Sequence, residues 1–387
     1  MGMSNGFENR PPTAEELTLM KEIVANAMQA GAIGMSTGLM YSPQGFATKE
    51  DVIELAKVVA EYNGIYASHI RSEEDRVVEA VQELIDIVEI SGCKGGQISH
   101  HKMAGMRNWG KSKVTLQMIA DANARGLNIR CDQYPYNRGS SNLRAALPPW
   151  VHEGGREQLL ERLKNFETRA KIKTSIMEGV ENWENWIDLM GFDHLYLSST
   201  DSDIWRDMES KSFAEIATIK GKDAWEIFFQ VLIDTEATAN ITIESMGEED
   251  IKNIMTSPYQ MFGTDSVAVP AMEMIGKVHP RTFGTYPRVL AKYVREEKLL
   301  IMEDAIRRMT SFPAQHFGLH DRGLIKEGMA ADLVIFNAET IRDTATFEDP
   351  LHYPEGISYV IVNGQIVINR GEQNQEVFPG KVLRRNK

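Results

Sequence analysis

The sequence predicts an α/β fold in which short parallel strands alternate with helices, as in a (β/α)8 barrel. Strands of about five residues and helices of about 12–17 residues follow one another through residues 1–136. Several of these strands end in histidine or aspartate, the position that active-site residues take in parallel barrels. The length of 387 residues fits a barrel with an appended module.

The pattern is regular over the first 136 residues. A helix begins at the capping box Thr13–Glu16, and a second begins at Thr48. The remaining predicted helices cover residues 75–91 and 112–125, each ended by a glycine. The predicted strands cover residues 32–36, 65–69, 96–100 and 127–132.

The alternation breaks after Tyr136 and returns near residue 248. Residues 137–250 are irregular, with helices near 155–165 and 224–234 and strand-like pieces at 195–199 and 239–243. A helix at 248–256, a strand at 259–265 and helices at 286–298 and 302–311 follow. Short strands at 331–336, 357–363 and 365–368 predict a small β module. We therefore divide the chain into 1–136, 137–250, 251–322 and 323–387.

Composition excludes several classes of function. The 42 basic and 55 acidic residues give a net charge of −13, which disfavours nucleic-acid and anionic-membrane partners. The two cysteines exclude a four-cysteine zinc site and fit a reducing compartment. The apolar runs are strand-sized, and the first residues lack the features of a signal peptide, so we expect a cytoplasmic protein.

The chemistry is predicted at the strand ends, where His69, His100, Asp132 and Asp265 lie. Two imidazoles from neighbouring strands suit zinc. A carboxylate on a further strand can ligate the metal or take a proton from an activated water. These residues predict metal-assisted hydrolysis. The structural alternative is that a strand-end histidine is only hydrogen-bonded, and that Asp132 only orients a histidine or caps a helix.

Other residues of the same types have simpler interpretations. His101 points away from His100, and the two cysteines, Cys93 and Cys131, are expected in the core. The tail histidines His316 and His320 are expected to be packing or surface groups.

The loop after Asp265 contains Arg281, which suits capture of a substrate carboxylate. An alternative role for Arg281 is to bind the carbonyls at a helix end.

Several motifs carry a family resemblance along most of the chain. They are Glu8–Thr13, Gly34–Tyr41, Ala67–Arg71, Gln97–Lys102, Asp132–Tyr136, Gly263–Ser266, His279–Leu290 and Gly328–Phe336. With these motifs the sequence resembles the D-aminoacylases, the N-acyl-D-amino-acid deacylases of the amidohydrolase superfamily. The Gly328–Phe336 motif marks only the superfamily, whereas the His279–Leu290 motif points to this family. The resemblance implies hydrolysis of the amide bond of N-acyl-D-amino acids, small-molecule substrates, to a carboxylate and a free D-amino acid.

The resemblance also implies roles for single residues. His69 and His100 are implied as zinc ligands, and Asp265 as the general acid and base. Whether Asp265 also contacts the metal stays open.

Substrate contacts are implied as well. Lys102, Tyr134 and Arg281 are implied to contact the substrate carboxylate or acyl group, and Tyr41 to line the pocket. By the same resemblance, residues 137–250 form a lid inserted after the seventh barrel strand, and residues 323–378 belong to a small β-sandwich.

The sequence departs from the family pattern at its N-terminal end. A family member has sandwich strands, a His-x-His motif and a cysteine ligand, but this sequence has no histidine before His69 and no cysteine before Cys93. On the family pattern the strand at 32–36 is about the fourth, which predicts an N-terminally truncated barrel short by on the order of 100 residues.

Two alternatives stay open. A non-catalytic remnant is one, because catalytic zinc sites usually have three protein ligands. A cyclic-amide hydrolase of the hydantoinase or dihydroorotase type is the other, although no lysine ends the strand at 32–36. The preferred D-amino acid and acyl group, the number of metals and the oligomeric state are open at this point.

Overall fold

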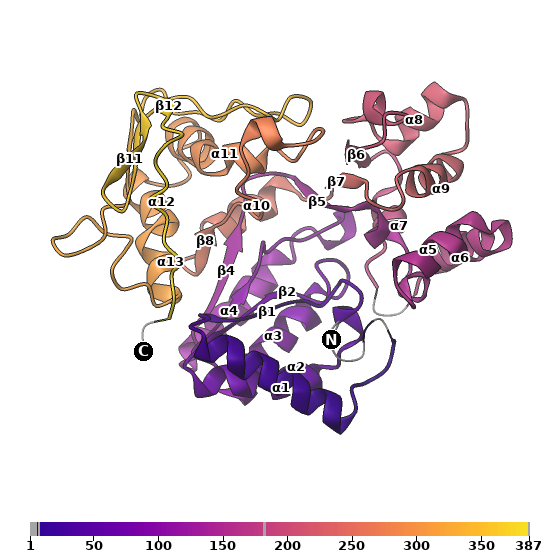
Figure 1. Cartoon of the computed structure of the whole chain (residues 1–387), viewed down its shortest axis with the longest axis horizontal. Helices are drawn as coiled ribbons and strands as arrows, with labels where there is room; N and C mark the ends of the chain where they lie inside the picture. The colour runs from indigo at the N-terminus through magenta and orange to yellow at the C-terminus, as the bar shows by residue number, and fades with distance from the viewer. Residues whose placement is uncertain (1–5, 7, 181–182, 386–387) are drawn as a thin grey trace.

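The computed structural model describes residues 6, 8–180 and 183–385, and these residues form three sheets (Figure 1). The central sheet is parallel, with the strand order β1-β2-β3-β4-β8. Its strands are β1 (Gly34–Gly38), β2 (Ile65–His69), β3 (Gly95–Ile98), β4 (Ile129–Gln133) and β8 (Gln260–Phe262). The predicted α/β class with a parallel sheet is therefore confirmed.

Helices that alternate with the strands pack beside this sheet (Figure 1). They are α1 (Ala14–Gln29), α2 (Lys49–Glu61), α3 (Val77–Ser91) and α4 (Ser112–Ala124). Their apolar faces share one core with the strands, which includes Ala56, Val59, Val81, Leu84, Ile98 and Ile119, all at most 1% exposed. Each fully buried Leu, Ile or Val of such a core stabilises the fold by about 1.5–3 kcal/mol.

Local sequence signals set the starts of the first two helices. Thr13 and Thr48 each form a capping box with the residue three positions later, as the sequence predicts for Thr13. The first strand begins two residues later than expected, at Gly34. A Cβ atom at Gly34 would lie 2.0 Å from the carbonyl oxygen of Ile65, so only glycine allows β1 to approach β2 this closely.

The region from residue 137 to residue 250 leaves the parallel sheet and has a core of its own (Figure 1). Its antiparallel sheet has the order β5-β7-β6, from β5 (Arg138–Asn142), β7 (Asn240–Glu244) and β6 (Leu195–Ser199). Its helices are α5 (Arg156–Lys164), α6 (Phe166–Glu178), α7 (Trp186–Met190), α8 (Phe213–Lys220) and α9 (Ala224–Asp234). The strand-like pieces expected at 195–199 and 239–243 thus pair with each other, and the second of them, β7, also pairs with β5.

The chain then returns to the parallel sheet through α10 (Glu248–Met255) and β8. A helical stretch follows, made of α11 (Arg281–Arg288), a π-helical segment (Val289–Glu296), α12 (Met302–Met309) and α13 (Ser311–His316). Pro287 lies inside α11, where it cannot donate a backbone hydrogen bond, and the π-helical segment starts two residues later.

The end of the chain forms a four-stranded antiparallel sheet with the order β12-β11-β10-β9 (Figure 1). Its strands are β9 (Leu333–Phe336), β10 (Ile357–Val362), β11 (Gln365–Asn369) and β12 (Glu372–Gln373). The expected strands are present, but the described residues form one sheet here. A second sheet that would complete a sandwich is not among them.

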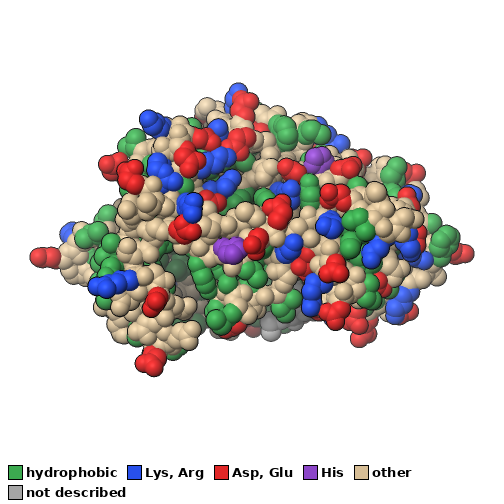
Figure 2. Space-filling model, turned by 90° about the horizontal axis from the view of Figure 1, so that it is seen from above, with side chains coloured by type: hydrophobic (Ala, Val, Ile, Leu, Met, Phe, Trp, Pro, Cys, Tyr) green, Lys and Arg blue, Asp and Glu red, His purple; other side chains and the backbone are tan. Residues whose placement is uncertain are grey.

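The parallel sheet is likewise open within the described part of the chain, since β1 pairs with β2 alone and β8 with β4 alone. A closed barrel needs a strand count, tilt and register that match, and the five strands described here do not form the closed (β/α)8 barrel that the sequence predicts. No helix of the described residues is long and apolar enough to cross a membrane. Figure 2 shows acidic and basic side chains intermixed on one face of the molecule.

Candidate functional site

The residues singled out in the sequence converge at the carboxyl edge of the parallel sheet. His69 ends β2, and His100 lies two residues beyond β3. Tyr134 directly follows β4, and Asp265 lies three residues beyond β8. Because parallel strands end at one edge of their sheet, these side chains lie close together. All seven predicted site residues line one cavity of about 210 Å³, namely Tyr41, His69, His100, Lys102, Tyr134, Asp265 and Arg281.

The two histidines face each other across this cavity. The Nδ1 atom of His69 lies 3.0 Å from the Nε2 atom of His100, and the ring centroids are 4.6 Å apart. The Nε2 atom of His69 is buried without a hydrogen-bond partner among the described residues. Burial lowers the pKa of His69 to about 3, so this imidazole is neutral near neutral pH and has a lone pair to share.

Asp132 binds the backbone of His100 through its carboxylate. Its Oδ1 accepts a 2.7 Å hydrogen bond from the backbone N–H of His100, and its Oδ2 accepts one from the Nε2 of Gln97. His100 has a φ of +37°, a conformation that few L-residues adopt. Asp132 therefore holds the backbone of His100 in place, which is the orienting role that the sequence left open for it.

Glu73 is the residue that sequence reasoning missed. Its Oε1 lies 2.8 Å from the Nδ1 of His100, and its Oε2 lies 3.9 Å from the Nε2 of His69. The three residues form a group whose possible ligand atoms all lie within 4.8 Å of one another. The signal was in the sequence, since Glu73 follows His69 by four residues, but its place depends on the loop after β2.

Lys102 completes the charge balance around Glu73. Its Nζ donates to the Oε1 of Glu73 at 2.6 Å and lies 2.7 Å from the Nδ1 of His100. Burial alone would raise the pKa of the Glu73 carboxyl, but the charge of Lys102 and the hydrogen bond with His100 hold it well below its usual range. Burial works against the charge on Lys102, yet Glu73 holds the pKa of the ammonium above its usual value. Glu73 and Lys102 are therefore an ion pair in the cavity wall.

This group fits a divalent metal ion. Neutral imidazole and carboxylate are ligands that zinc accepts, and the Nδ1 of His69 and the Nε2 of His100 face each other at 3.0 Å. The ligand atoms come from two adjacent strands and the loop between them, so the fold brings them together without a metal.

The opposite wall carries an arginine and an aspartate. Arg281 is the first residue of α11, and its buried guanidinium lies 2.9 Å from the Oδ2 of Asp265 and 4.5 Å from the ring centroid of Tyr134. The Nη1 atom of Arg281 forms no hydrogen bond of good geometry within the described residues. Burial raises the pKa of the Tyr134 hydroxyl, which therefore keeps its proton as a donor. The guanidinium thus points to the cavity and away from helix-end carbonyls.

Residues of the 137–250 region close the cavity. Ser140, Ser141, Trp186 and Ser245 line it, and Ser141 donates to the hydroxyl of Tyr41 at 3.4 Å. The Tyr41 ring lies 4.8 Å from that of His69. The cavity therefore has walls from both the parallel sheet and this region.

Two reciprocal hydrogen bonds join this region to the loop that carries Glu73. The Glu184 carboxyl accepts from the backbone N–H of Glu73, and the Glu74 carboxyl accepts from the backbone N–H of Asn185 at 3.1 Å. Burial, together with the charge of Glu73, raises the pKa of Glu184 to about 8. The loop after β2 is therefore tied to the start of α7.

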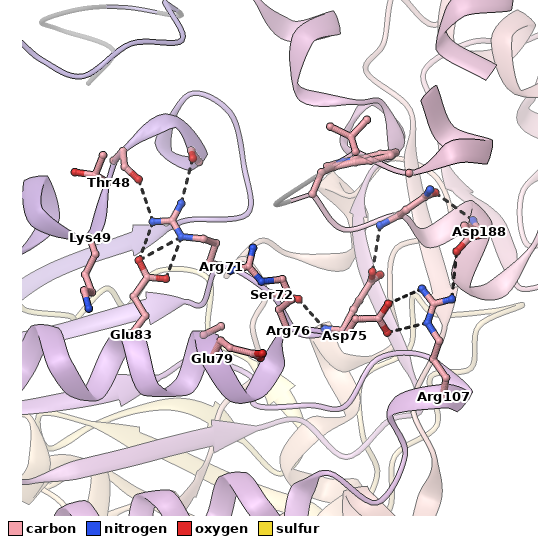
Figure 3. A pocket seen from close by; sticks show the side chains of 18 residues that line it. Thr48, Lys49, Arg71, Ser72, Asp75, Arg76, Glu79, Glu83, Arg107 and Asp188 are labelled. Atoms are coloured by element: carbon pink, nitrogen blue, oxygen red, sulfur yellow. Dashed lines mark hydrogen bonds and ion pairs between the residues drawn. The ribbon is translucent and has the colours of Figure 1, made fainter. Parts of the chain in front are cut away.

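A larger cavity of about 690 Å³ is also lined by this loop, through Arg71, Ser72 and Asp75 (Figure 3). Five of its charged groups are paired with one another, since Arg71 binds Glu83 and Arg107 bridges Asp75 and Asp188 (Figure 3). It contains none of the predicted site residues. We therefore place the functional site in the smaller cavity.

Three of the other histidines, His101, His316 and His320, do not line this cavity. His101 is buried and its Nε2 bonds the Thr115 hydroxyl on α4, on the far side from His100. His316 packs beside Phe317 in the core, whereas His320 is exposed. Cys93 and Cys131 are buried free thiols, as expected.

Comparisons with known proteins identify the family of this chain. The model of the amidohydrolase family matches residues 4–368. The chain belongs to the amidohydrolase family. It is 33% identical over 375 residues to an N-acyl-D-glutamate deacylase of Alcaligenes xylosoxydans xylosoxydans, covering 97% of this chain and 65% of that protein.

Two further amidohydrolases are similar over most of the chain. A D-aminoacylase of the same organism is 32% identical over 358 residues, or 92% of this chain and 62% of its own length. The crystal structure of N-acyl-D-glutamate deacylase from Bordetella bronchiseptica, with zinc and a phosphonate inhibitor, is 31% identical with a TM-score of 0.77. The superposition covers 67% of that deacylase chain and 97% of this chain. The chain thus spans somewhat under two thirds of the curated relatives that it matches.

Proposed function

We propose that this amidohydrolase cleaves the amide bond of N-acyl-D-amino acids with the help of zinc, giving a carboxylate and a free D-amino acid. The observation that carries the proposal is the single cavity that brings His69 and His100 together with Asp265 and Arg281. The relatives named as deacylases of N-acyl-D-amino acids support the substrate class.

His69 and His100 would hold the metal, with the Glu73 carboxylate beside them. Bound there, zinc supplies an activated water at neutral pH and polarises the acyl carbonyl. Zinc in the similar deacylase structure supports this choice of metal.

The remaining residues bind the substrate and move the proton. Arg281, Tyr134 and Lys102 bind the α-carboxylate, for which a buried guanidinium is the strongest partner in the cavity. A carboxylate that takes this place competes with Asp265 for Arg281 and frees the Asp265 carboxylate. Asp265 then accepts the proton of the attacking water and passes it to the leaving amine nitrogen. Tyr41 shapes the pocket beside His69.

We further propose how the parts of the fold serve this site. The five parallel strands, in segments 1–136 and 251–322, belong to a (β/α)8 barrel. Residues 137–250 form the lid, since Trp186 and Ser141 line the cavity from that region. Residues 323–387 contribute to a small β-sandwich, for which the exposed Val334 and Ile335 on β9 offer apolar surface.

Replacement of Asp265 by asparagine tests the proposal. Asp265→Asn keeps the size of the side chain but cannot accept the proton, so turnover of an N-acetyl-D-amino acid should fall at least about 100-fold, the contribution of a general base. Asp188→Asn, in the larger cavity, is the matched control and should leave turnover unchanged. Wild-type turnover in Asp265→Asn would contradict the assignment.

A substrate panel separates the alternatives. Faster hydrolysis of hydantoins than of N-acetyl-D-amino acids would favour a cyclic-amide hydrolase, although β1 carries no lysine. A purified chain that neither binds zinc nor hydrolyses any member of the panel would favour a non-catalytic remnant.

A further inference from the structure

The four ring nitrogens of the two histidines divide into two sets. The Nδ1 of His69 and the Nε2 of His100 face each other at 3.0 Å. The other two nitrogens face one carboxylate, since the Nδ1 of His100 lies 2.8 Å from the Oε1 of Glu73 and the Nε2 of His69 lies 3.9 Å from its Oε2. Glu73 therefore hydrogen-bonds the outer nitrogen of His100, whereas the Nε2 of His69 lies beyond hydrogen-bond distance from it.

A neutral imidazole has one nitrogen with a lone pair and one that carries a proton. A metal ion binds the lone pair, and the outer partner of the second nitrogen decides which tautomer is present. We propose that Glu73 is a positioning residue that keeps the proton of His100 on Nδ1, so that the Nε2 of His100 presents its lone pair to a metal. The inference rests on the proposed metal site.

Hydrogen bonds hold both the backbone N–H and the backbone carbonyl of Glu73 in place. The Glu184 carboxyl accepts its N–H, and its carbonyl accepts the N–H of Ala104 at 2.8 Å. The side chain is buried, with 6% of the residue exposed. The carboxylate therefore cannot easily turn away from the histidines.

Glu73 is needed because Lys102 would otherwise donate a proton to the same nitrogen of His100. The ammonium of Lys102 lies 2.7 Å from the Nδ1 of His100 and has only protons to donate. Without Glu73, Lys102 would donate to this Nδ1 and leave the proton of His100 on Nε2, where it blocks metal binding. With Glu73 present, Lys102 and His100 both donate to its Oε1, at 2.6 and 2.8 Å.

Zinc titrations of the full chain against a chromophoric chelator test the inference. Glu73→Ala should weaken zinc binding about 10- to 100-fold, the usual effect of losing an outer partner of a metal-bound histidine. Glu79→Ala, in the first turn of α3 and exposed, is the matched control and should bind zinc like the wild type. Unchanged affinity in Glu73→Ala, together with weaker binding in His69→Asn, would overturn the role of Glu73 and leave the metal site standing. Unchanged affinity in His69→Asn would overturn the metal site itself.

A double variant distinguishes tautomer control from a loss of packing. Removal of the competing ammonium in Glu73→Ala/Lys102→Met should restore part of the zinc affinity that Glu73→Ala loses. A purely structural role for Glu73 predicts a further loss instead.

A measurement on the wild-type chain avoids variants that fail to fold. With ¹⁵N-labelled imidazoles, NMR of the zinc-loaded chain should show the proton of His100 on Nδ1. A proton on the Nε2 of His100 would overturn the inference.

Discussion

Arg281 offers the sharpest test of how the cavity recognises its substrate. Arg281→Met keeps much of the length and apolar contact over Tyr134 but removes the guanidinium that lies 2.9 Å from Asp265. A hydrogen bond to a charged group contributes about 1.5–3 kcal/mol, which corresponds to about a 10- to 150-fold loss. We therefore expect kcat/KM for N-acetyl-D-methionine to fall by that factor.

The assay compares two substrates in the zinc-loaded chain. N-acetyl-D-methionine carries the α-carboxylate, and N-acetyl-3-(methylthio)propylamine is the same molecule without it. Arg281→Met should reduce kcat/KM for the first much more than for the second, because only the first meets the guanidinium. Arg107→Met, in the larger cavity, should change neither value. Equal losses for both substrates would refute carboxylate binding by Arg281.

Three further predictions concern specificity, pH and stability. Among the described residues, the cations that line the cavity are Lys102 and Arg281, and each already faces a carboxylate. The kcat/KM for N-acetyl-D-methionine should therefore exceed that for N-acetyl-D-glutamate by at least about tenfold. A preference for the acidic substrate would contradict this prediction. Burial lowers the pKa of His316 to about 3, below its unfolded value of about 6.5, so its neutral form stabilises the fold above about pH 6.5 and this stability is lost as the pH falls. Between about pH 7 and pH 5, the free energy of unfolding measured in urea should therefore fall by about 2 kcal/mol because of His316. This fall should be absent in His316→Asn and present in the exposed control His320→Asn. Phe228→Ala should cost about 3–5 kcal/mol of unfolding free energy because Phe228 is fully buried, whereas Phe166→Ala, at 77% exposure, should cost little.

The sequence predicts the regular elements around the parallel sheet well, because their signals are local. The capping box at Thr13 marks the start of α1, and the predicted strand at 65–69 coincides with β2. Helix α9 at Ala224–Asp234 is also found where its apolar pattern placed it.

The elements that were missed depend on contacts between distant segments. Strand β5 (Arg138–Asn142) has no apolar alternation and exists because it pairs with β7, about a hundred residues later. Helix α11 starts at Arg281, before the predicted start at 286, and passes through Pro287 in a sequence rich in helix breakers.

The site shows the same division. Strand ends are local features, so His69, His100 and Asp265 could be selected from the sequence. Glu73 lies in a loop whose shape depends on Glu184, more than a hundred residues away, and its place beside His100 could not be read from its spacing alone.

Zinc-dependent, stereospecific hydrolysis is the most direct test of the account. The full chain, freed of metal with a chelator, should hydrolyse N-acetyl-D-methionine in proportion to added zinc until one site is filled, with no hydrolysis of the L enantiomer. His69→Asn should not respond to zinc in the same range. Hydrolysis that is independent of zinc, or equal for both enantiomers, would contradict the proposed function.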